Sequence, residues 1–205
     1  MHLTCRDLVV RFRPDVELFR GLSFDLTQGD LVSLTGPSGS GKSTLLEVLA
    51  GWRAPTAGTV SRNGVVTVAW VFQSPVGVAR RSALDHVALP FLVQGTRRPG
   101  ADARAAELLD RFGLAAVADR PFGALSGGEA QRLMFTRAVA KGADLLLVDE
   151  PTAQLDPASA ATVNRVLGEL AGTRSIVVVA SHDLATQAAC DRTIDVRGVP
   201  AGVAT

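Results

Sequence analysis

A glycine-rich run near residue 40 carries residue types that can hold phosphate groups. It reads Gly-Pro-Ser-Gly-Ser-Gly-Lys-Ser-Thr over residues 36–44 and fits the full G-x-x-x-x-G-K-[ST] pattern. Glycines allow the backbone to turn tightly and to aim N–H groups at phosphate oxygens. Lys42 can place its ammonium between terminal phosphates, and Ser43 can offer its hydroxyl to Mg²⁺. The run therefore predicts a nucleoside triphosphate site. Its candidate binding residues are Gly36, Ser38, Gly39, Ser40, Gly41, Lys42, Ser43 and Thr44.

Two adjacent carboxylates end a short apolar run further along the chain. Residues 145–148 are all apolar, and Asp149 and Glu150 follow them directly. Asp149 would face a Mg²⁺ site beside the phosphate loop, and Glu150 could polarise a water toward the γ-phosphate. Adjacent side chains point in different directions, so the two acids can have separate roles. Alone, these acids would also suit a solvated strand end, and it is the phosphate loop that favours the catalytic interpretation.

The elements that must position these groups can be read from the apolar pattern. Residues 31–35 form an expected buried strand that runs into the phosphate loop, and residues 42–50 have helical apolar spacing. Further apolar strands are expected at 145–148 and 175–180. Because these strands do not alternate with polar residues, they indicate a parallel sheet covered by helices. Helices are also expected at 128–141, 157–171 and from about Leu184 onward.

Two regions depart from this pattern. The first thirty residues contain short, partly alternating runs separated by turn residues, as antiparallel β-structure does. Residues 101–112 are rich in Ala, Leu, Arg and Glu and predict a helix, whereas residues 97–100 are expected to form an exposed turn. We therefore predict a single α/β domain over residues 1–205. It has a P-loop NTPase sheet core, an N-terminal antiparallel β-subdomain, and an α-helical subdomain inserted at about 74–125.

Composition limits the other classes of function. The chain of 205 residues has a formal net charge of +1, which gives no electrostatic argument for a nucleic-acid partner. Cys5 and Cys190 belong to no CxxC pair, which argues against a zinc site. The N-terminus lacks the apolar core of a signal peptide, and the longest apolar runs are strand-sized. We expect a soluble, cytoplasmic chain that would act at a membrane only through a partner.

The segment that narrows the choice among phosphate-loop proteins precedes the acidic strand. It reads Leu-Ser-Gly-Gly-Glu-Ala-Gln-Arg over residues 125–132 and closely resembles the LSGGQ-type signature of ABC (ATP-binding cassette) ATPases. Taken without the resemblance, the segment is only a flexible loop and helix cap. The resemblance implies that Ser126, Gly127 and Gly128 contact the ATP held by a neighbouring chain.

Two further motifs follow in the order of that family. Gln73 matches the Q-loop glutamine, which is implied to touch Mg²⁺ and the attacking water. Asp156 matches the acid of the D-loop, although Ala153 and Gln154 replace the first two residues of its usual SALD form.

A histidine and an aromatic residue complete the resemblance. His182 matches the switch histidine and is implied to hydrogen-bond the γ-phosphate. Phe12 stands where the family usually has an aromatic ring stacked on adenine, and a core phenylalanine is the alternative. His2 and His86 match no motif and are interpreted as ordinary residues.

The resemblance implies an ATPase that uses ATP and Mg²⁺ as the motor of an ABC transporter. A membrane permease would lie on a separate chain. With ATP bound, the cassette would close head to tail with an identical copy, as a homodimer, or with a related cassette, at the inner face of the cell membrane. A non-transport ABC ATPase, for example of the iron–sulfur assembly type, is the alternative. A phosphate-loop kinase or GTPase is disfavoured by the signature and by His182. Residues 82–91 look like the same region in cassettes of lipoprotein-release and macrolide-export systems.

Overall fold

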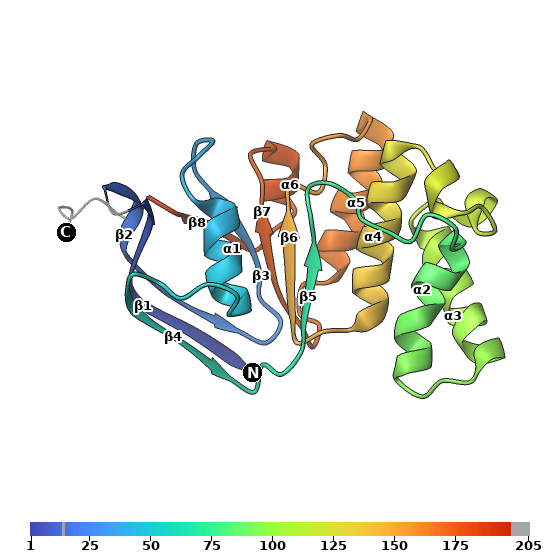
Figure 1. Cartoon of the computed structure of the whole chain (residues 1–205), viewed down its shortest axis with the longest axis horizontal. Helices are drawn as coiled ribbons and strands as arrows, with labels where there is room; N and C mark the ends of the chain where they lie inside the picture. The colour runs from blue at the N-terminus through green and yellow to red at the C-terminus, as the bar shows by residue number, and fades with distance from the viewer. Residues whose placement is uncertain (14, 198–205) are drawn as a thin grey trace.

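The computed structural model describes residues 1–13 and 15–197, which form two sheets with helices between and beside them (Figure 1). The smaller sheet is antiparallel, with strand order β2-β1-β4. Its strands are β1 (His2–Arg13), β2 (Val16–Thr27) and β4 (Ala57–Asn63). β1 is the central strand and pairs with both neighbours.

The larger sheet is parallel throughout and has the order β5-β6-β7-β3-β8. Its strands are β5 (Val68–Val71), β6 (Leu145–Asp149), β7 (Ile176–Ala180), β3 (Leu31–Thr35) and β8 (Arg192–Asp195). β6 and β7 are buried along their whole lengths, as expected for strands covered on both faces. Since parallel strands end at the same edge, the residues after β3, β6 and β7 come together there.

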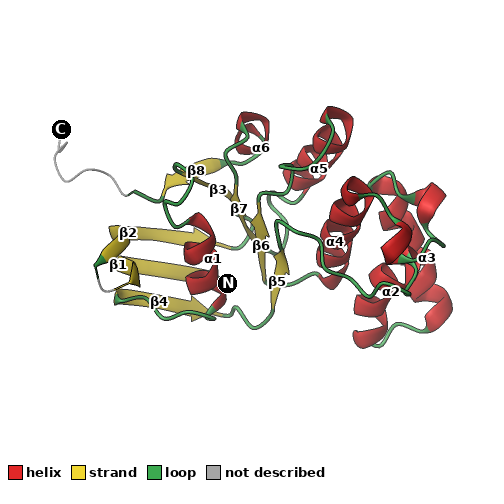
Figure 2. Cartoon of the chain, turned by 45° about the horizontal axis from the view of Figure 1, so that its top comes forward, coloured by secondary structure: helices red, strands yellow, loops and turns green. Residues whose placement is uncertain are grey.

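Helices cover both faces of the parallel sheet (Figure 2). α1 (Lys42–Ala50) lies between the two sheets. α4 (Gly127–Lys141) and α5 (Pro157–Glu169) lie on the opposite face, and the short α6 (Leu184–Ala188) follows β7. α2 (Ala83–Val93) and α3 (Arg98–Arg111) pack beside α4, away from the sheet.

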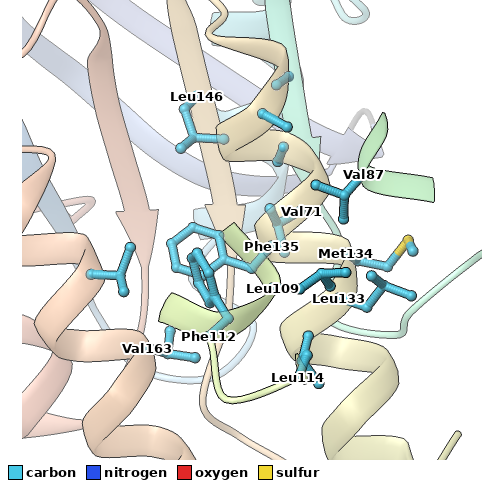
Figure 3. Packing of buried hydrophobic residues seen from close by; sticks show 14 of the residues in the cluster. Val71, Val87, Leu109, Phe112, Leu114, Leu133, Met134, Phe135, Leu146 and Val163 are labelled. Carbon is cyan, nitrogen blue, oxygen red and sulfur yellow. The ribbon is translucent and has the colours of Figure 1, made fainter. Parts of the chain in front are cut away.

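Two apolar cores hold these layers together. One joins the antiparallel sheet and α1 to one face of the parallel sheet. The other joins the opposite face to the helices, and its centre is shown in Figure 3. There the rings of Phe112 and Phe135 meet edge to face, with centroids 5.4 Å apart, a favourable aromatic geometry. The second core therefore ties the segment after α3 to α4 and to the sheet.

The predicted fold class is confirmed, and the strand at 31–35 and the helix at 42–50 have the predicted bounds. The exposed turn expected at 97–100 is wrong, because α3 begins at Arg98 with Pro99 in its first turn. Proline is tolerated there, since the first helical N–H groups have no intrahelical acceptor. β4 and β8 were not anticipated, and β1 and β2 are longer than the short runs predicted. Within the described residues, no helix is long and apolar enough to span a bilayer.

Candidate active site

The phosphate loop is held in shape by glycines between β3 and α1. Gly36, Gly39 and Gly41 have φ values of 144°, 79° and 94°, which L side chains rarely adopt. A Cβ on Gly36 would lie 2.7 Å from Ser40 Oγ, and one on Gly41 would lie 3.0 Å from Leu18 Cβ. The loop therefore needs glycine at these two positions for space as well as for conformation.

Lys42 begins α1 and lies over the loop. Its Nζ donates to the carbonyl oxygens of Gly36 at 2.9 Å and of Pro37 at 3.2 Å, and the side chain is largely buried. A lysine ammonium has three donors, so these two contacts leave one for an anion. The positive charge adds to that of the helix N-terminus, which favours phosphate at the same point.

Asp149 ends β6 beside the first turn of α1. Burial raises the pKa of its carboxyl, whereas a hydrogen bond with Ser43 lowers it. The described residues contain no group of three or more His, Cys, Asp and Glu side chains that could hold a metal by itself. One carboxylate and one hydroxyl nevertheless fit Mg²⁺, which prefers few protein ligands and takes phosphate oxygens and waters as the others.

Glu150 follows Asp149 in a left-handed backbone conformation, with φ of 45°. Such a conformation costs about 1–3 kcal/mol for a residue other than glycine, and it is often found at active sites. The Glu150 N–H donates to the Ala180 carbonyl at 2.8 Å, which anchors the turn to β7. Its Oε2 lies 2.9 Å from His182 Nδ1, so the predicted base and the predicted switch histidine are in contact.

These groups line one cleft of about 710 Å³. Gln73 and Phe12, which are distant in sequence, also line it. Phe12 is 59 % exposed, so the alternative of a core phenylalanine is wrong. Ser40 is not in the lining and lies against Gly36. The predicted residues that line the cleft are Phe12, Gly36, Ser38, Gly39, Gly41, Lys42, Ser43, Thr44, Gln73, Asp149, Glu150 and His182.

The signature and the D-loop acid lie outside this cleft and cap helices instead. Ser126 is the N-cap of α4, and its hydroxyl accepts from the Glu129 N–H at 3.3 Å. In return, the Glu129 carboxylate accepts from the Ser126 N–H at 2.7 Å, which completes a capping box. Asp156 is the N-cap of α5 and accepts from the Ser159 N–H at 3.0 Å. Ser126, Gly127, Gly128 and Asp156 are all absent from the cleft lining.

A second cavity, which we call the aromatic groove, was missed by the sequence analysis. It has a volume of about 600 Å³. Trp52 stacks on Trp70 with ring centroids 4.7 Å apart, and Phe72 stacks on Trp70 at 5.3 Å. Trp70 is on β5, and Phe72 follows the last residue of that strand. Side chains two residues apart in extended backbone point to the same side, so that pair could have been noticed in the sequence. No sequence pattern predicts that Trp52 packs against these two rings. The side chains that line the groove include Trp52, Trp70, Phe72, Val76, Val93, Arg137 and Lys141.

A five-stranded parallel sheet with a phosphate loop after one strand and paired acids after another defines a P-loop nucleotide hydrolase. Comparison with known proteins narrows the class, because residues 19–153 match the ABC transporter family. The chain belongs to this family, and it is an ATP-binding and ATP-hydrolysing subunit of the ABC type.

Individual relatives agree with this assignment. The ATP-binding protein LolD of the lipoprotein-releasing system of Myxococcus xanthus is 41 % identical over 184 residues, which are 82 % of each chain. The macrolide export ATP-binding/permease protein MacB of Nitrosomonas europaea is 34 % identical over 200 residues, 90 % of this chain and 30 % of that protein. These names include both types of system that residues 82–91 resemble.

A solved structure shares the fold over nearly the whole chain. It is a dimer of the ATP-binding cassette MJ0796 in a post-hydrolysis state, bound to ADP and Pi. It has a TM-score of 0.82 at 25 % identity and covers 95 % of this chain and 94 % of that one. The predicted resemblance and ATPase activity are confirmed, and the non-transport alternative receives no support from these matches.

Proposed function

We propose that two copies of the chain close head to tail around ATP, and that this closure drives a permease on a separate chain. The observation that carries the proposal is the separation of two phosphate-binding surfaces. One is the cleft with Lys42, and the other is the exposed N-terminus of α4 at Ser126 and Gly127. Because the second surface does not line the cleft, it is available to a triphosphate held by another copy.

Within such a dimer, the cleft residues would have separate tasks. The loop amides and Lys42 bind the terminal phosphates, and Phe12 stacks on the adenine. Asp149 and Ser43 would hold Mg²⁺, which neutralises phosphate charge when bound. Gln73 would contact the metal and the attacking water from the end of the adjacent strand.

Hydrolysis would depend on the contact between Glu150 and His182. Glu150 is the general base that takes a proton from the attacking water. His182 is 71 % exposed in its side chain and Glu150 only 13 %, so the histidine can turn to the γ-phosphate while the less exposed carboxylate keeps its place. Loss of the γ-phosphate then removes the charge that joins the two copies and lets the dimer open.

The aromatic groove is the surface proposed for the permease. Trp52 is 62 % exposed and Val93 is 80 % exposed, and both line the same cavity. A contiguous exposed apolar patch of this kind marks a surface for a partner. Arg137 and Lys141 also line the groove, and none of the acidic side chains that the structure describes does. A permease helix with one apolar face and a carboxylate fits this lining. We therefore place the chain at the cytoplasmic face of the cell membrane, peripheral to the permease.

The assigned base is tested with Glu150→Gln. This variant keeps the size of the side chain but removes the base, so turnover should fall about 100-fold or more while ATP binding remains. With ATP, the variant should form a dimer in size-exclusion chromatography with light scattering. Glu107→Gln on the exposed face of α3 is the control and should leave turnover unchanged. Normal turnover in Glu150→Gln would show that another group is the base.

The shared site is tested by mixing two inactive chains. Lys42→Ala impairs the cleft, and Gly127→Asp puts a carboxylate at the signature, where a Cβ meets nothing within 4 Å. A mixed dimer has one intact cleft facing one intact signature, so ATP hydrolysis should recover partly when the two variants are combined. If the mixture is as inactive as each variant alone, the two-chain site is wrong.

A further inference from the structure

The segment between β5 and α2 touches both the cleft and the aromatic groove. Phe72 at its start lines the groove, Gln73 lines the cleft, and residues 74–76 line the groove again. Residues 74–82 contain no helix or strand of their own. Their position must therefore be fixed by contacts with neighbouring elements.

His86 on α2 supplies the central contact. The side chain is 1 % exposed, and Nε2 accepts from the Val78 N–H at 3.0 Å. Nδ1 lies 2.8 Å from the Ser82 carbonyl oxygen. Since Nε2 must be the acceptor toward an N–H group, Nδ1 carries the proton and donates to Ser82. Both ring nitrogens of the neutral ring are then satisfied.

The charges around His86 favour the neutral ring. Burial lowers the pKa of His86, and Arg137 and Arg81 lower it further, while the Ser82 carbonyl and Asp85 act in the opposite direction. The ring therefore keeps its acceptor for Val78 near neutral pH, and the contact does not depend on a protonation change there.

The same segment also contacts the residues that directly precede the signature. The Phe122 ring packs against His86 with centroids 5.5 Å apart, and a Cβ on Gly77 would lie 2.6 Å from that ring. The Phe122 N–H donates to Arg81 O and the Gly123 N–H to Ala79 O, both at 2.9 Å. Only residues 124 and 125 separate this contact from Ser126, the N-cap of α4.

We propose that His86 is a positioning residue that fixes the Val78 segment against Phe122 and so holds the aromatic groove and the signature in one arrangement. A partner seated in the groove then acts on the signature through hydrogen-bonded and packed residues. The expected consequence is a change in how the signature contacts ATP, and this part of the inference rests on the proposed function. The contact itself is independent of that function.

Three substitutions separate the two ring nitrogens. His86→Gln can present an amide oxygen where Nε2 accepts from Val78. The shorter His86→Asn can replace only the Nδ1 contact with Ser82, and His86→Leu replaces neither. A positioning role through Val78 predicts that Gln restores the wild-type behaviour and that Asn does not. His2→Asn, at an exposed histidine on β1, is the control.

The first measurement is hydrogen–deuterium exchange of the isolated chain without nucleotide. The Val78 amide and residues 120–125 should exchange at least tenfold faster in His86→Asn and His86→Leu, and at the wild-type rate in His86→Gln and His2→Asn. Wild-type exchange in both Asn and Leu variants would overturn the proposal. If His86→Leu does not fold, the comparison of Gln with Asn decides.

The second measurement uses ATP-dependent dimerisation in the Glu150→Gln background. Adding His86→Asn should raise the ATP concentration needed for half-maximal dimer several-fold, and adding His86→Gln should not. An unchanged ATP requirement with faster exchange would overturn the link to the signature. If Glu150→Gln alone does not dimerise, the proposed function fails, and the exchange measurement still reports on His86.

Discussion

The nucleotide cleft and the aromatic groove have similar volumes, about 710 and 600 Å³, but they are built differently. The phosphate-binding part of the cleft comes from one continuous loop whose backbone shape is set by glycines. The groove combines side chains after α1, on β5, on α2 and on α4. A phosphate has the same shape in every relative, whereas a partner helix has its own sequence. A site formed by the backbone therefore suits phosphate, and a site formed by side chains suits a partner helix of a given sequence.

Substitutions at two loop glycines test whether backbone shape governs the cleft, and this is where we expect the largest effect. Gly39 and Gly41 both have positive φ. A Cβ on Gly41 would crowd Leu18 and Phe19 at 3.0–3.1 Å, whereas one on Gly39 meets nothing within 4 Å. Gly39→Ala then carries only the left-handed cost of about 1–2 kcal/mol. Gly41→Ala must also displace Leu18 and Phe19 or shift the start of α1.

We expect Gly41→Ala to weaken ATP binding about 100-fold and Gly39→Ala about 5- to 30-fold, in line with those costs. Titration with a fluorescent ATP analogue measures both affinities. Circular dichroism serves as a check that both variants fold. Equal losses at the two positions would mean that crowding by Leu18 does not explain the requirement for glycine at 41.

A substitution in the aromatic groove should weaken binding to the permease and leave ATP hydrolysis nearly unchanged. Trp52→Ala removes the exposed ring from the stack with Trp70, and Trp52 does not line the cleft. ATP hydrolysis by the isolated chain should stay within about twofold, while binding to the permease should fall about tenfold, as for an aromatic interface residue. Co-purification from detergent-solubilised membranes, with mass spectrometry, measures the yield of a multi-span membrane protein.

The matched control for Trp52→Ala is Val66→Ala. Val66 is 86 % exposed and does not line the groove, so its loss should change neither hydrolysis nor co-purification. If Trp52→Ala reduces hydrolysis of the isolated chain as strongly as it reduces co-purification, the nucleotide cleft and the aromatic groove do not function independently.

The cleft is built largely from contiguous residues and the groove from distant ones. This difference explains which features could be predicted from the sequence. The phosphate loop, the acidic strand end and their flanking elements are encoded in short contiguous runs, so residues 31–50 and 145–150 were predicted closely. The groove could not be, because Trp52 meets Trp70 only after α1 and β5 have packed. His86 was interpreted as ordinary for the same reason, since Val78 and Phe122 reach it through the fold. β8 was missed because its four residues, Arg192–Asp195, alternate only weakly.

α1 is the one described helix that connects the two sites, since it begins at Lys42 in the cleft and ends just before Trp52 in the groove. Arg62 of β4 donates to two of its last carbonyl groups. Arg62 Nε donates to Leu49 O at 2.8 Å, and its NH2 group donates to Val48 O. A guanidinium at this end also complements the negative pole of the helix.

Arg62→Met keeps much of the aliphatic side chain and removes these donors, so it should have the smallest effect of the three. Loss of the hydrogen bonds should cost about 1–2 kcal/mol, which for a chain of this size lowers Tm by about 2–4 °C per kcal/mol. Scanning calorimetry measures the shift, and Arg174→Met, at an exposed arginine beyond α5, should leave Tm unchanged.

The consequence for the two sites follows from where Arg62 contacts α1. The substitution loosens the end of the helix next to Trp52, eight residues and about two turns from Lys42, although the backbone bonds from Gly51 and Trp52 remain there. Permease co-purification should therefore fall several-fold, while ATP affinity stays within about twofold, because the glycine loop holds the other end independently. If ATP affinity falls in proportion to co-purification, α1 moves as a rigid unit, and the cleft and the groove are mechanically one site.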